Sequence, residues 1–349
     1  MTTDTQPAGV AVCLVTHDSA PDVAGCMAAI GAMAAFGSQG AGGAGRGARP
    51  LEIVVIDSGS RDGSLDEARR TAPAGVPFVG EAHAANIGFA AGMNAAIAAT
   101  RAPYILSLNA DARPAADYVE RLISRMEAHP DLQVAAVTGR LVRPPAPDGS
   151  RDLDACGMRL TRTWRHLDRG SGETDHGQWA AADRVFGATG AASLFRRAAL
   201  ADAAVDGEVF DPRFHSFRED AELCFRLRER GWEVLYEPAA VAEHRRFNLP
   251  ERRAAMPPAV NLHSLKNRYL LRIYHQTAGN LLRTLLPTAA RDLAALGYVL
   301  LRERTSFAAY TWLWRHRAEL LARRRTIQRR RRLAAGDLDR WFGSQGAPL

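Results

Sequence analysis

Lysine is almost absent from this chain of 349 residues: Lys266 is the only one, and the other cationic side chains that carry a permanent charge are arginines. This bias is typical of a GC-rich coding sequence. Cysteine is also scarce, and Cys13, Cys26, Cys156 and Cys224 form neither a CxxC pair nor a spacing typical of zinc sites. Two of the four lie in apolar stretches, as small core residues do. These absences argue against a zinc module or a disulfide framework and favour a reducing, cytoplasmic compartment.

Signals of several other protein classes are missing too. Residues 1–9 are polar and lack the apolar region of a signal peptide. The chain contains no run of about 18 uncharged apolar residues, so we expect no membrane-spanning helix. The Gly-rich stretch at 36–50 lacks the GK[ST] ending of a phosphate-binding loop, and we interpret it as a flexible surface insertion.

Charge is unevenly distributed along the chain. Residues 1–244 carry 24 arginines and 32 acidic residues, a net charge of −8, whereas residues 245–349 carry 21 basic and 6 acidic residues, a net charge of +15. We therefore expect a catalytic domain at 1–245 and a basic, amphipathic helical region at 246–349. Such a region is suited to an anionic partner, either phospholipid or nucleic acid.

Short apolar runs alternate with helical segments over most of the first part. The predicted strands span 10–15, 51–56, 77–80, 104–108, 134–142, 185–195 and 232–236, and the predicted helices span 21–33, 62–70, 88–100, 114–129 and 221–230. This alternation predicts an α/β fold with a mostly parallel sheet flanked by helices. Ligands of such sheets bind beyond the carboxyl ends of the strands, where Asp57 and Asp111 both fall.

Three patterns in this region suggest chemistry, and each also has a structural explanation. Asp111, at the end of the triplet Asn109-Ala110-Asp111, can ligate a hard divalent cation that binds diphosphate, although the triplet also favours a turn. Asp220 opens a predicted helix, whose dipole favours the charged form that a general base needs, although it could be a helix cap. His244 is a plausible metal ligand or a structural histidine.

The order and spacing of these features resemble the family-2 glycosyltransferases, which have the GT-A fold of nucleotide-diphospho-sugar transferases. The resemblance covers most of residues 10–244. The matching segments are VAVCLVTHDS (10–19), EIVVIDSGSRDGS (52–64), NIGFAAGMN (86–94), YILSLNADARP (104–114), FGATGAASLFRRAAL (186–200), FDPRFHSFREDAELCFRLRERGW (210–232) and VAEH (241–244).

The resemblance implies specific roles at the reaction centre. Asp220 matches the catalytic base. Asp111 matches the last aspartate of the family's DxD motif, which holds Mg²⁺ or Mn²⁺ against the diphosphate, and His244 matches a histidine that completes that metal site. Asn109 replaces the first aspartate of the motif, so it offers an amide oxygen but adds no charge. Glu222 replaces a frequent aspartate and is either a helix-face charge or an acceptor contact.

The resemblance also implies binding roles around that centre. Thr16 and Asp57 match positions that contact the nucleobase and its ribose. The loop at Asn86 and Gly88 matches one that lines the nucleotide site. The segment beside the donor and acceptor sugars is matched by Thr189 and Gly190, with Glu219 nearby.

One base and one displacement predict inversion at the anomeric carbon. The resemblance implies a donor linked to dTDP, UDP or GDP, with rhamnose and galactofuranose as plausible sugars. Relatives with similar tails often act on polyprenyl-diphosphate-linked glycans, so a glycan or polyprenyl-linked acceptor in cell-envelope polysaccharide synthesis is the expected class. No residue distinguishes among these donors.

The C-terminal region contains arginine-studded amphipathic segments at 261–275, 289–301 and 307–321, followed by seven arginines within residues 323–332. Aromatic edges and clustered cations suit an anionic membrane surface, which predicts a peripheral protein on the cytoplasmic face of the inner membrane. The alternative is a helical cap that packs on the catalytic domain and leaves a solvated basic end.

Other classes explain less of the sequence. A nucleic-acid- or membrane-binding protein with a non-catalytic nucleotide-sugar-binding domain would use the arginine-rich tail, but no zinc finger or RRM motif occurs, and we expect no nucleic-acid partner. A sugar nucleotidyltransferase needs a Gly-rich basic loop after its first strand, where this chain has THDSAPD. A Rossmann dehydrogenase would need a GxGxxG motif at the same place.

Overall fold

The computed structural model describes residues 9–38, 49–246 and 256–349. Most of the Gly-rich stretch at 36–50, which we interpreted as a flexible insertion, lies outside the described residues, as does nearly all of the polar N-terminal segment.

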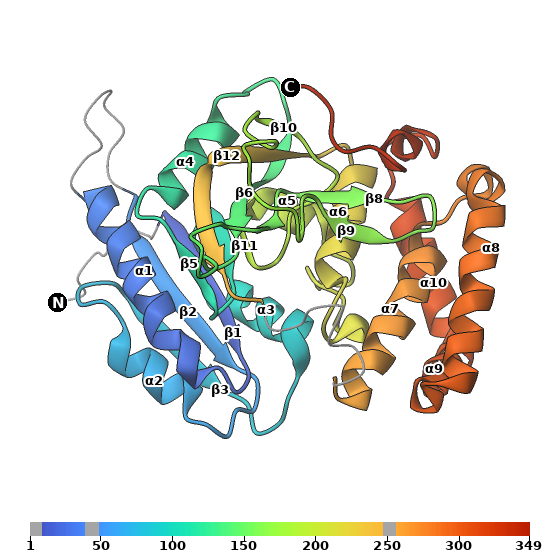
Figure 1. Ribbon diagram of the computed structural model, residues 1–349, viewed down its shortest axis with the longest axis horizontal. Coiled ribbons are helices and arrows are strands. Elements are labelled where there is room, and N and C mark those ends of the chain that lie inside the picture. Colours follow the sequence, from blue (N-terminus) through green and yellow to red (C-terminus); the bar gives the residue numbers. More distant parts are fainter. Residues whose placement is uncertain (1–8, 39–48, 247–255) are drawn as a thin grey trace.

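A twisted ten-stranded sheet forms the centre of the part predicted to be catalytic, residues 1–245, which is called the catalytic part below (Figure 1). Its main path has the order β10-β12-β6-β11-β4-β1-β2-β3, with β5 pairing with β12 and β7 with β6. The strands are β1 (Val10–Thr16), β2 (Leu51–Asp57), β3 (Phe78–Ala82), β4 (Tyr104–Leu108), β5 (Ala112–Pro114), β6 (Val134–Val142), β7 (Leu153–Ala155), β10 (Asp183–Arg184), β11 (Ala192–Arg196) and β12 (Glu233–His244).

Parallel pairing dominates the core of this sheet. Strands β4, β1, β2 and β3 are mutually parallel neighbours, and β6 runs parallel to β12, while β11 is inserted antiparallel between β4 and β6. The predicted α/β class with a mostly parallel sheet is therefore confirmed. Only the end of the strand predicted at 185–195 is a strand in the structure, because β10 ends at Arg184 and β11 begins at Ala192. The structure also extends the strand predicted at 232–236 as far as His244.

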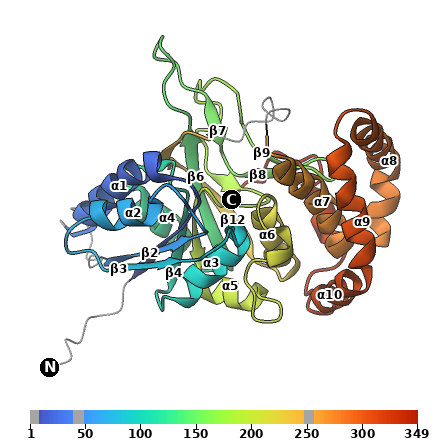
Figure 2. The same ribbon diagram turned by 90° about the horizontal axis from the view of Figure 1, so that it is seen from below.

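Helices cover both faces of the sheet, as Figure 2 shows. They are α1 (Ala20–Ser38), α2 (Ser64–Thr71) and α4 (Tyr118–Glu127) on one face, and α3 (Gly88–Ala98), α5 (Arg197–Ala203) and α6 (Glu219–Glu229) on the other. The alternation of β1 explains this arrangement, because successive side chains of a strand point to opposite faces. Val10, Val12 and Leu14 join the core under α1, whereas Ala11 and Cys13 join the core under α3.

Helix α1 is, within the described parts of the chain, the one helix long and apolar enough to cross a membrane. It connects the parallel strands β1 and β2, as a crossover helix does, and its residues Val23, Cys26, Met27 and Ile30 are buried in the core beneath it. Its apolar composition is therefore explained by packing on the sheet.

The C-terminal region forms a block of helices beside α6 (Figures 1 and 2). They are α7 (Pro258–His275), α8 (Ala278–Leu301), α9 (Ala308–Arg315) and α10 (Arg317–Arg329). The block shares an apolar core with the catalytic part, in which Phe225 of α6 lies with Leu270, Ile327 and Trp341. A small hairpin, β8 (Met158–Leu160) and β9 (His166–Asp168), contributes Met158 to the same core.

The arginine run at 323–332 contacts the protein extensively. Arg323 is buried and pairs with Asp211 at 2.9 Å, and Arg331 pairs with Glu229. Arg324 donates to the carbonyl of Gln276 at 2.7 Å. Further arginines of the run, Arg330 and Arg332, contact residues 202–204 at the C-terminal end of α5. This end of the chain packs on the catalytic part instead of forming a fully solvated basic end.

Candidate active site

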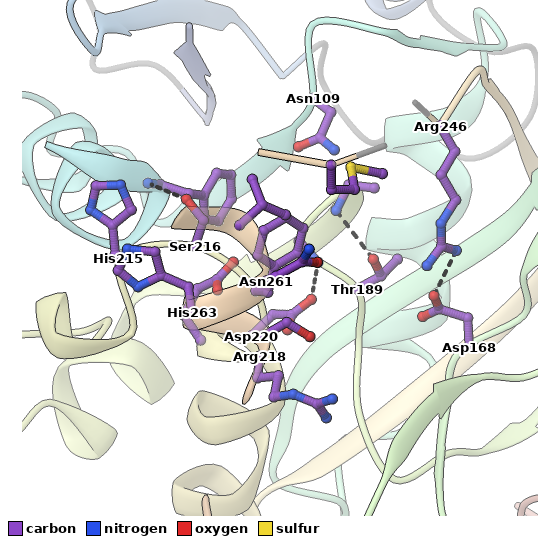
Figure 3. Close-up of a pocket in the computed structure, with 18 of the residues that line it drawn as sticks. Asn109, Asp168, Thr189, His215, Ser216, Arg218, Asp220, Arg246, Asn261 and His263 are labelled. Atoms are coloured by element: carbon purple, nitrogen blue, oxygen red, sulfur yellow. Dashed lines mark hydrogen bonds and ion pairs between the residues drawn. The ribbon is translucent and has the colours of Figure 1, made fainter. Parts of the chain in front are cut away.

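A cavity of about 2020 Å³ opens at the carboxyl ends of the parallel strands and continues to the C-terminal helices (Figure 3). Most of the residues that the sequence singled out line it. They are Asn86, Gly88, Asn109, Asp111, Thr189, Gly190, Glu219, Asp220 and His244. Residues far apart in the sequence therefore converge on one site, from β4, β12, the β10–β11 connection and the start of α6.

Asp220 lies in the first turn of α6 with its carboxylate fixed by two main-chain donors. The amide of Gly190 donates to Oδ2 at 3.1 Å, and the amide of Ala221 donates to Oδ1 at 2.7 Å. Figure 3 shows the carboxylate near the middle of the lining side chains, close to Asn261 of α7. The carboxylate is held in one orientation, which is what a proton acceptor needs.

The electrostatic environment of Asp220 differs from that of the adjacent Glu219. Burial raises the pKa of Asp220 to about 6, with a further contribution from Asp168, while the amides of Gly190 and Ala221 oppose the rise. Burial and the charge of Asp220 raise the pKa of Glu219 well above its ordinary value. Burial thus raises the pKa of both adjacent carboxyls, while the two main-chain amides stabilise the charged form of Asp220.

The backbone just before Asp220 is strained. His215, Phe217 and Arg218 have φ values of 63°, 71° and 73°, which side chains other than glycine rarely adopt. The buried amide of Asn267, on α7, donates to the carbonyl of Phe217 at 2.7 Å and to two other carbonyls of the segment. Strained segments persist where neighbouring structure holds them, and they cluster at functional sites.

A second polar group lies across the cavity around His244. Its Nε2 is 3.2 Å from Oδ1 of Asp111 and 3.4 Å from the amide nitrogen of Asn109. Its Nδ1 is 2.7 Å from Oδ2 of Asp154, which is buried on β7. Arg246 pairs with the other oxygen of Asp154 at 3.1 Å, so the acidic residue behind the imidazole is itself fixed.

The ionisation of this group follows from its contacts. Burial favours the neutral imidazole, but the hydrogen bonds and charges of Asp111 and Asp154 outweigh it and raise the pKa of His244 to about 9. Although burial alone would raise it, the pKa of Asp111 is lowered by the contact with His244. A divalent cation that displaced the proton from Nε2 would satisfy both ligands.

The donor set fits a divalent cation held jointly by protein and substrate. Within the described ranges, no three His, Cys, Asp or Glu side chains are placed to enclose a metal. Mg²⁺, however, typically takes one or two carboxylates and completes its shell with water and phosphate oxygens. The pair Asp111–His244 offers two such ligands, and Asp154 orients the imidazole in the way that supporting carboxylates orient metal-bound histidines.

Thr16 and Asp57 are not among the cavity-lining residues. They face each other in the register of β1 and β2, and the Thr16 hydroxyl donates to Asp57 Oδ2 at 2.8 Å. Asp57 also accepts from the amide of Ser60 at 2.9 Å. At this edge the cavity is lined by His17 and Ser58, and His17 Nδ1 lies 2.8 Å from the Ser58 carbonyl. The predicted contact of Thr16 and Asp57 with a nucleobase stays a prediction; here they shape the adjoining loop.

The loop at Asn86 is held by its own hydrogen bonds. Asn86 Oδ1 accepts from the amide of Gly88 at 2.9 Å and from the Ser58 hydroxyl at 3.1 Å. Gly88 has a φ of +80°, and a Cβ there would lie 2.5 Å from His215 Nδ1. Glycine is therefore required where the loop at Asn86 meets the strained segment before α6.

The segment at Thr189 and Gly190 joins the two halves of the site. Ser107 of β4 donates to the Gly190 carbonyl at 2.6 Å, while the Gly190 amide holds Asp220. The Thr189 hydroxyl accepts from the amide of Ala191 at 3.3 Å. The antiparallel strand β11 begins just after this segment, which places it beside the ends of the parallel strands.

Two residues of the site, Asp154 and Asn261, were not identified from the sequence. Asp154 lies in the loop-rich stretch at 143–182, where its only signal is a carboxylate between the apolar Leu153 and Ala155. Asn261 of α7 is buried at the cavity wall and lies outside the segments that resemble the family. Glu222 is neither a solvent-facing charge nor an acceptor contact: it is fully buried and pairs with Arg226 at 2.6 Å.

Solved structures with this fold have distant sequences. GalNAc-T7, solved with UDP, GalNAc and Mn²⁺, is 12% identical with a TM-score of 0.51 over 78% of this chain and 49% of that chain. TarS from S. aureus is 13% identical with a TM-score of 0.50 over 84% and 45%. The mannosyltransferase PcManGT from Pyrobaculum calidifontis, in complex with GDP-Man and Mn²⁺, is 16% identical with a TM-score of 0.48 over 97% and 88%.

The chain thus spans about half the length of the first two structures. Comparison with curated protein sequences found no match. The family model described as glycosyl transferase family 2 matches residues 12–202, which is more than half of the chain. This match, the GT-A-like sheet and the convergence of the expected residues on one cavity lead to one conclusion: the chain belongs to glycosyl transferase family 2.

Proposed function

We propose that this glycosyltransferase moves a hexosyl or deoxyhexosyl group from a nucleoside diphosphate to a glycan hydroxyl with inversion, and that Asp220 is its base. The observation that carries the proposal is the position of Asp220. Its carboxylate is held by Gly190 and Ala221, and it lines the same cavity as Asp111 and His244. A proton acceptor and a diphosphate-binding group therefore share one site.

The reaction would proceed in one displacement. The acceptor hydroxyl oxygen attacks the anomeric carbon as its proton passes to the Asp220 carboxylate. The bond between that carbon and the diphosphate oxygen breaks, and its electron pair leaves with the nucleoside diphosphate. Attack opposite the leaving group inverts the anomeric configuration.

Asp111 and His244 would hold the divalent cation, and Asn109 lies within reach to contribute its amide oxygen or to hydrogen-bond phosphate. Bound there, Mg²⁺ or Mn²⁺ supplies positive charge against the departing diphosphate. Asp154 keeps the Nε2 of His244 directed at Asp111. We expect the loops at His17, Ser58 and Asn86 to bind the nucleoside.

We propose dTDP-, UDP- and GDP-linked sugars as the candidate donors. The structural neighbour GalNAc-T7 was solved with UDP. We further propose that the transferred sugar is rhamnose or galactofuranose and that the enzyme acts in the synthesis of an envelope polysaccharide.

We also propose that the protein works on the surface of an anionic membrane. Because the arginine run at 323–332 contacts the catalytic part, it is less available to a membrane than the outer face of α8 is. That face exposes Leu282, Leu286 and Leu293 by 76%, 81% and 70%. Arg283 of the same helix and Arg304, just beyond its end, are also exposed. An exposed apolar stripe with nearby cations suits a lipid headgroup layer.

The replacement of Asp220 by Asn tests the proposal. Thermal shifts across UDP-, dTDP- and GDP-sugars with Mn²⁺ identify the donor, and turnover is then compared. We expect D220N to keep the donor-induced shift and to lose at least about a hundredfold in transfer, the usual contribution of a general base. The matched control is D66N, on the exposed surface of α2. Undiminished transfer by D220N would remove Asp220 from the base role.

The nucleic-acid alternative depends on the arginine-rich tail. Because Arg323, Arg324 and Arg331 pair with protein groups, fewer cations are free for phosphate. A salt titration that compares duplex DNA with phosphatidylglycerol vesicles separates the two partners. Preferred binding to DNA would favour the alternative.

A further inference from the structure

The cavity extends past Asp220 toward the C-terminal helices, and the wall there is rich in arginine. Arg165 comes from the turn between β8 and β9, Arg218 from the strained segment before α6, Arg268 from α7 and Arg291 from α8. Four separate parts of the chain thus bring guanidinium groups to one end of the cavity. Figure 3 shows Arg218 beside Asp220 on the side away from Asn109.

Few acidic groups balance these charges. Arg268 pairs with Asp292 at 2.6 Å. For Arg165, Arg218 and Arg291, no carboxylate among the described residues lies within the 4.0 Å of an ion pair. The Arg218 Nη1 atom lies 3.0 Å from the Nδ1 of His166, which is not an anion. The buried Nε atoms of Arg268 and Arg291 find no hydrogen-bond partner in the described structure.

The arginines also repel one another. Burial, followed by the charges of Arg268, Arg165 and Arg291, lowers the pKa of Arg218 to about 10. Burial and the same kind of repulsion lower the pKa of Arg165 and of Arg291. A guanidinium still keeps its proton at neutral pH, so the cluster stays charged and unfavourable until an anion enters.

The geometry of α8 relates this cluster to the protein surface. Arg291, Ala295, Tyr298 and Val299 line the cavity at spacings of three to four residues, so they share one face of the helix. The exposed Leu282, Leu286 and Leu293 fall on the opposite face, about half a turn away at roughly 100° per residue. One face of α8 thus carries a cation into the cavity, and the other presents leucine outward.

We propose that Arg165, Arg218, Arg268 and Arg291 form an acceptor subsite that binds the phosphate or diphosphate joining the acceptor glycan to its carrier. The proposal rests on the proposed function, because it places the acceptor beside Asp220. A guanidinium donates two parallel hydrogen bonds to phosphate oxygens, and a cavity partly shielded from water strengthens them. Binding there would hold the acceptor hydroxyl near the base.

The first experiment measures inorganic pyrophosphate binding by calorimetry, with the full chain in buffer without added divalent cation. We expect the double variant R165Q/R291Q to bind at least about tenfold more weakly than wild type, since hydrogen bonds to charged groups contribute that much or more. The matched control R302Q removes an exposed arginine at the end of α8 that does not line the cavity. It should bind as wild type does.

Thermal unfolding separates binding from a structural role. No carboxylate among the described residues lies within ion-pair distance of Arg165 or Arg291, and repulsion by neighbouring arginines exceeds the attraction of Asp292 for Arg291. Neutralisation of the two arginines therefore relieves repulsion. We expect R165Q/R291Q to melt at the same temperature as wild type or higher, because residues that are kept for function often lower the stability of a protein. A lower melting temperature together with unchanged pyrophosphate binding would overturn the proposal.

The source of the phosphate is tested with vesicles of phosphatidylglycerol. If the cluster binds carrier-linked phosphate, R165Q/R291Q weakens pyrophosphate binding and leaves vesicle binding unchanged. If the variant loses vesicle binding only, the arginines serve membrane headgroups and the subsite is disproved. The donor panel with Mn²⁺ is run in parallel: the absence of any donor response would refute the proposed function, whereas unchanged pyrophosphate affinity in the variant refutes the subsite alone.

Discussion

The side-chain amide of Asn267 donates to the main-chain carbonyl of Phe217 at 2.7 Å, which ties the C-terminal helices to the segment that presents Asp220. The same amide donates to the carbonyls of Phe214 and Ser216, each at 2.8 Å. The carboxylate that we propose as the base thus depends on Asn267, and both residues lie outside residues 12–202, which the family model matches. Helix α7 is a support for the site as well as an appendage to the catalytic part.

Replacement of Asn267 by Ala should therefore lower kcat more than it weakens donor binding. It removes all three hydrogen bonds to a strained segment, and a displacement of about 1 Å can cost a hundredfold in rate. Unfolding should become easier by about 1–3 kcal/mol, the cost of leaving buried carbonyls unpaired. Steady-state kinetics and thermal unfolding measure the two effects.

The matched control for this change is N280A. Asn280 is also a buried asparagine of the C-terminal block, but it caps α8 and does not touch the segment before Asp220. It should lose stability and keep kcat. Equal losses of kcat in the two variants would show that general destabilisation, not positioning, explains the effect of N267A.

Transfer should increase with pH around the pKa of Asp220. Burial raises that pKa to about 6, and only the ionised carboxylate accepts a proton. Below this value the ionised fraction falls about tenfold per pH unit, so the rate falls with it; above it the rate levels off. Initial rates with a fixed donor and Mn²⁺ concentration measure the profile. A rate that declines as pH rises through this range would contradict the assignment of the base.

Substitution of Asp154 by Asn should weaken activation by metal. Asp154 fixes the His244 imidazole through a 2.7 Å contact, and loss of such a supporting carboxylate typically weakens metal binding by about 10–100-fold. Titration of activity with Mn²⁺ measures the change, which should appear in the metal concentration required and not in the maximal rate. The exposed Asp148 provides the control D148N. The same Mn²⁺ requirement in wild type and D154N would show that His244 needs no such support.

The parts of the fold that the sequence predicts correctly are those that local pattern determines. The runs at 10–15, 51–56 and 104–108 are continuous and apolar because their strands are buried on both faces, and the structure places strands there within about one residue. Polar side chains that follow such strands share an edge of the sheet because parallel strands end together. The position of Asp111 at this edge is therefore predictable from the sequence alone.

What the sequence did not reveal depends on partners distant in the chain. Glu222 is buried because Arg226 and the α7 residue His275 surround it, and the contact with Arg226 holds its pKa at about 2 despite burial. No residue near Glu222 in the sequence indicates that His275 will contact it. Asp154 was missed for the same reason, because its role depends on His244, at the end of β12. The sequence of the arginine run likewise does not indicate that acidic residues of the catalytic part, such as Asp211 and Glu229, pair with it.

Membrane binding should depend on the outer face of α8. Leu282 and Leu286 lie one helical turn apart and are exposed, so their replacement by Glu in L282E/L286E leaves the core intact. We expect flotation with phosphatidylglycerol vesicles to fall at least about tenfold, since burial of a leucine contributes roughly 1.5–3 kcal/mol. The melting temperature should stay unchanged, as for most surface substitutions. The control V79E replaces an exposed residue of β3, at the other end of the molecule in Figure 1. If wild type and L282E/L286E float equally well, the protein meets the membrane elsewhere, and the leucine stripe must be covered by another surface, such as a second copy of the chain.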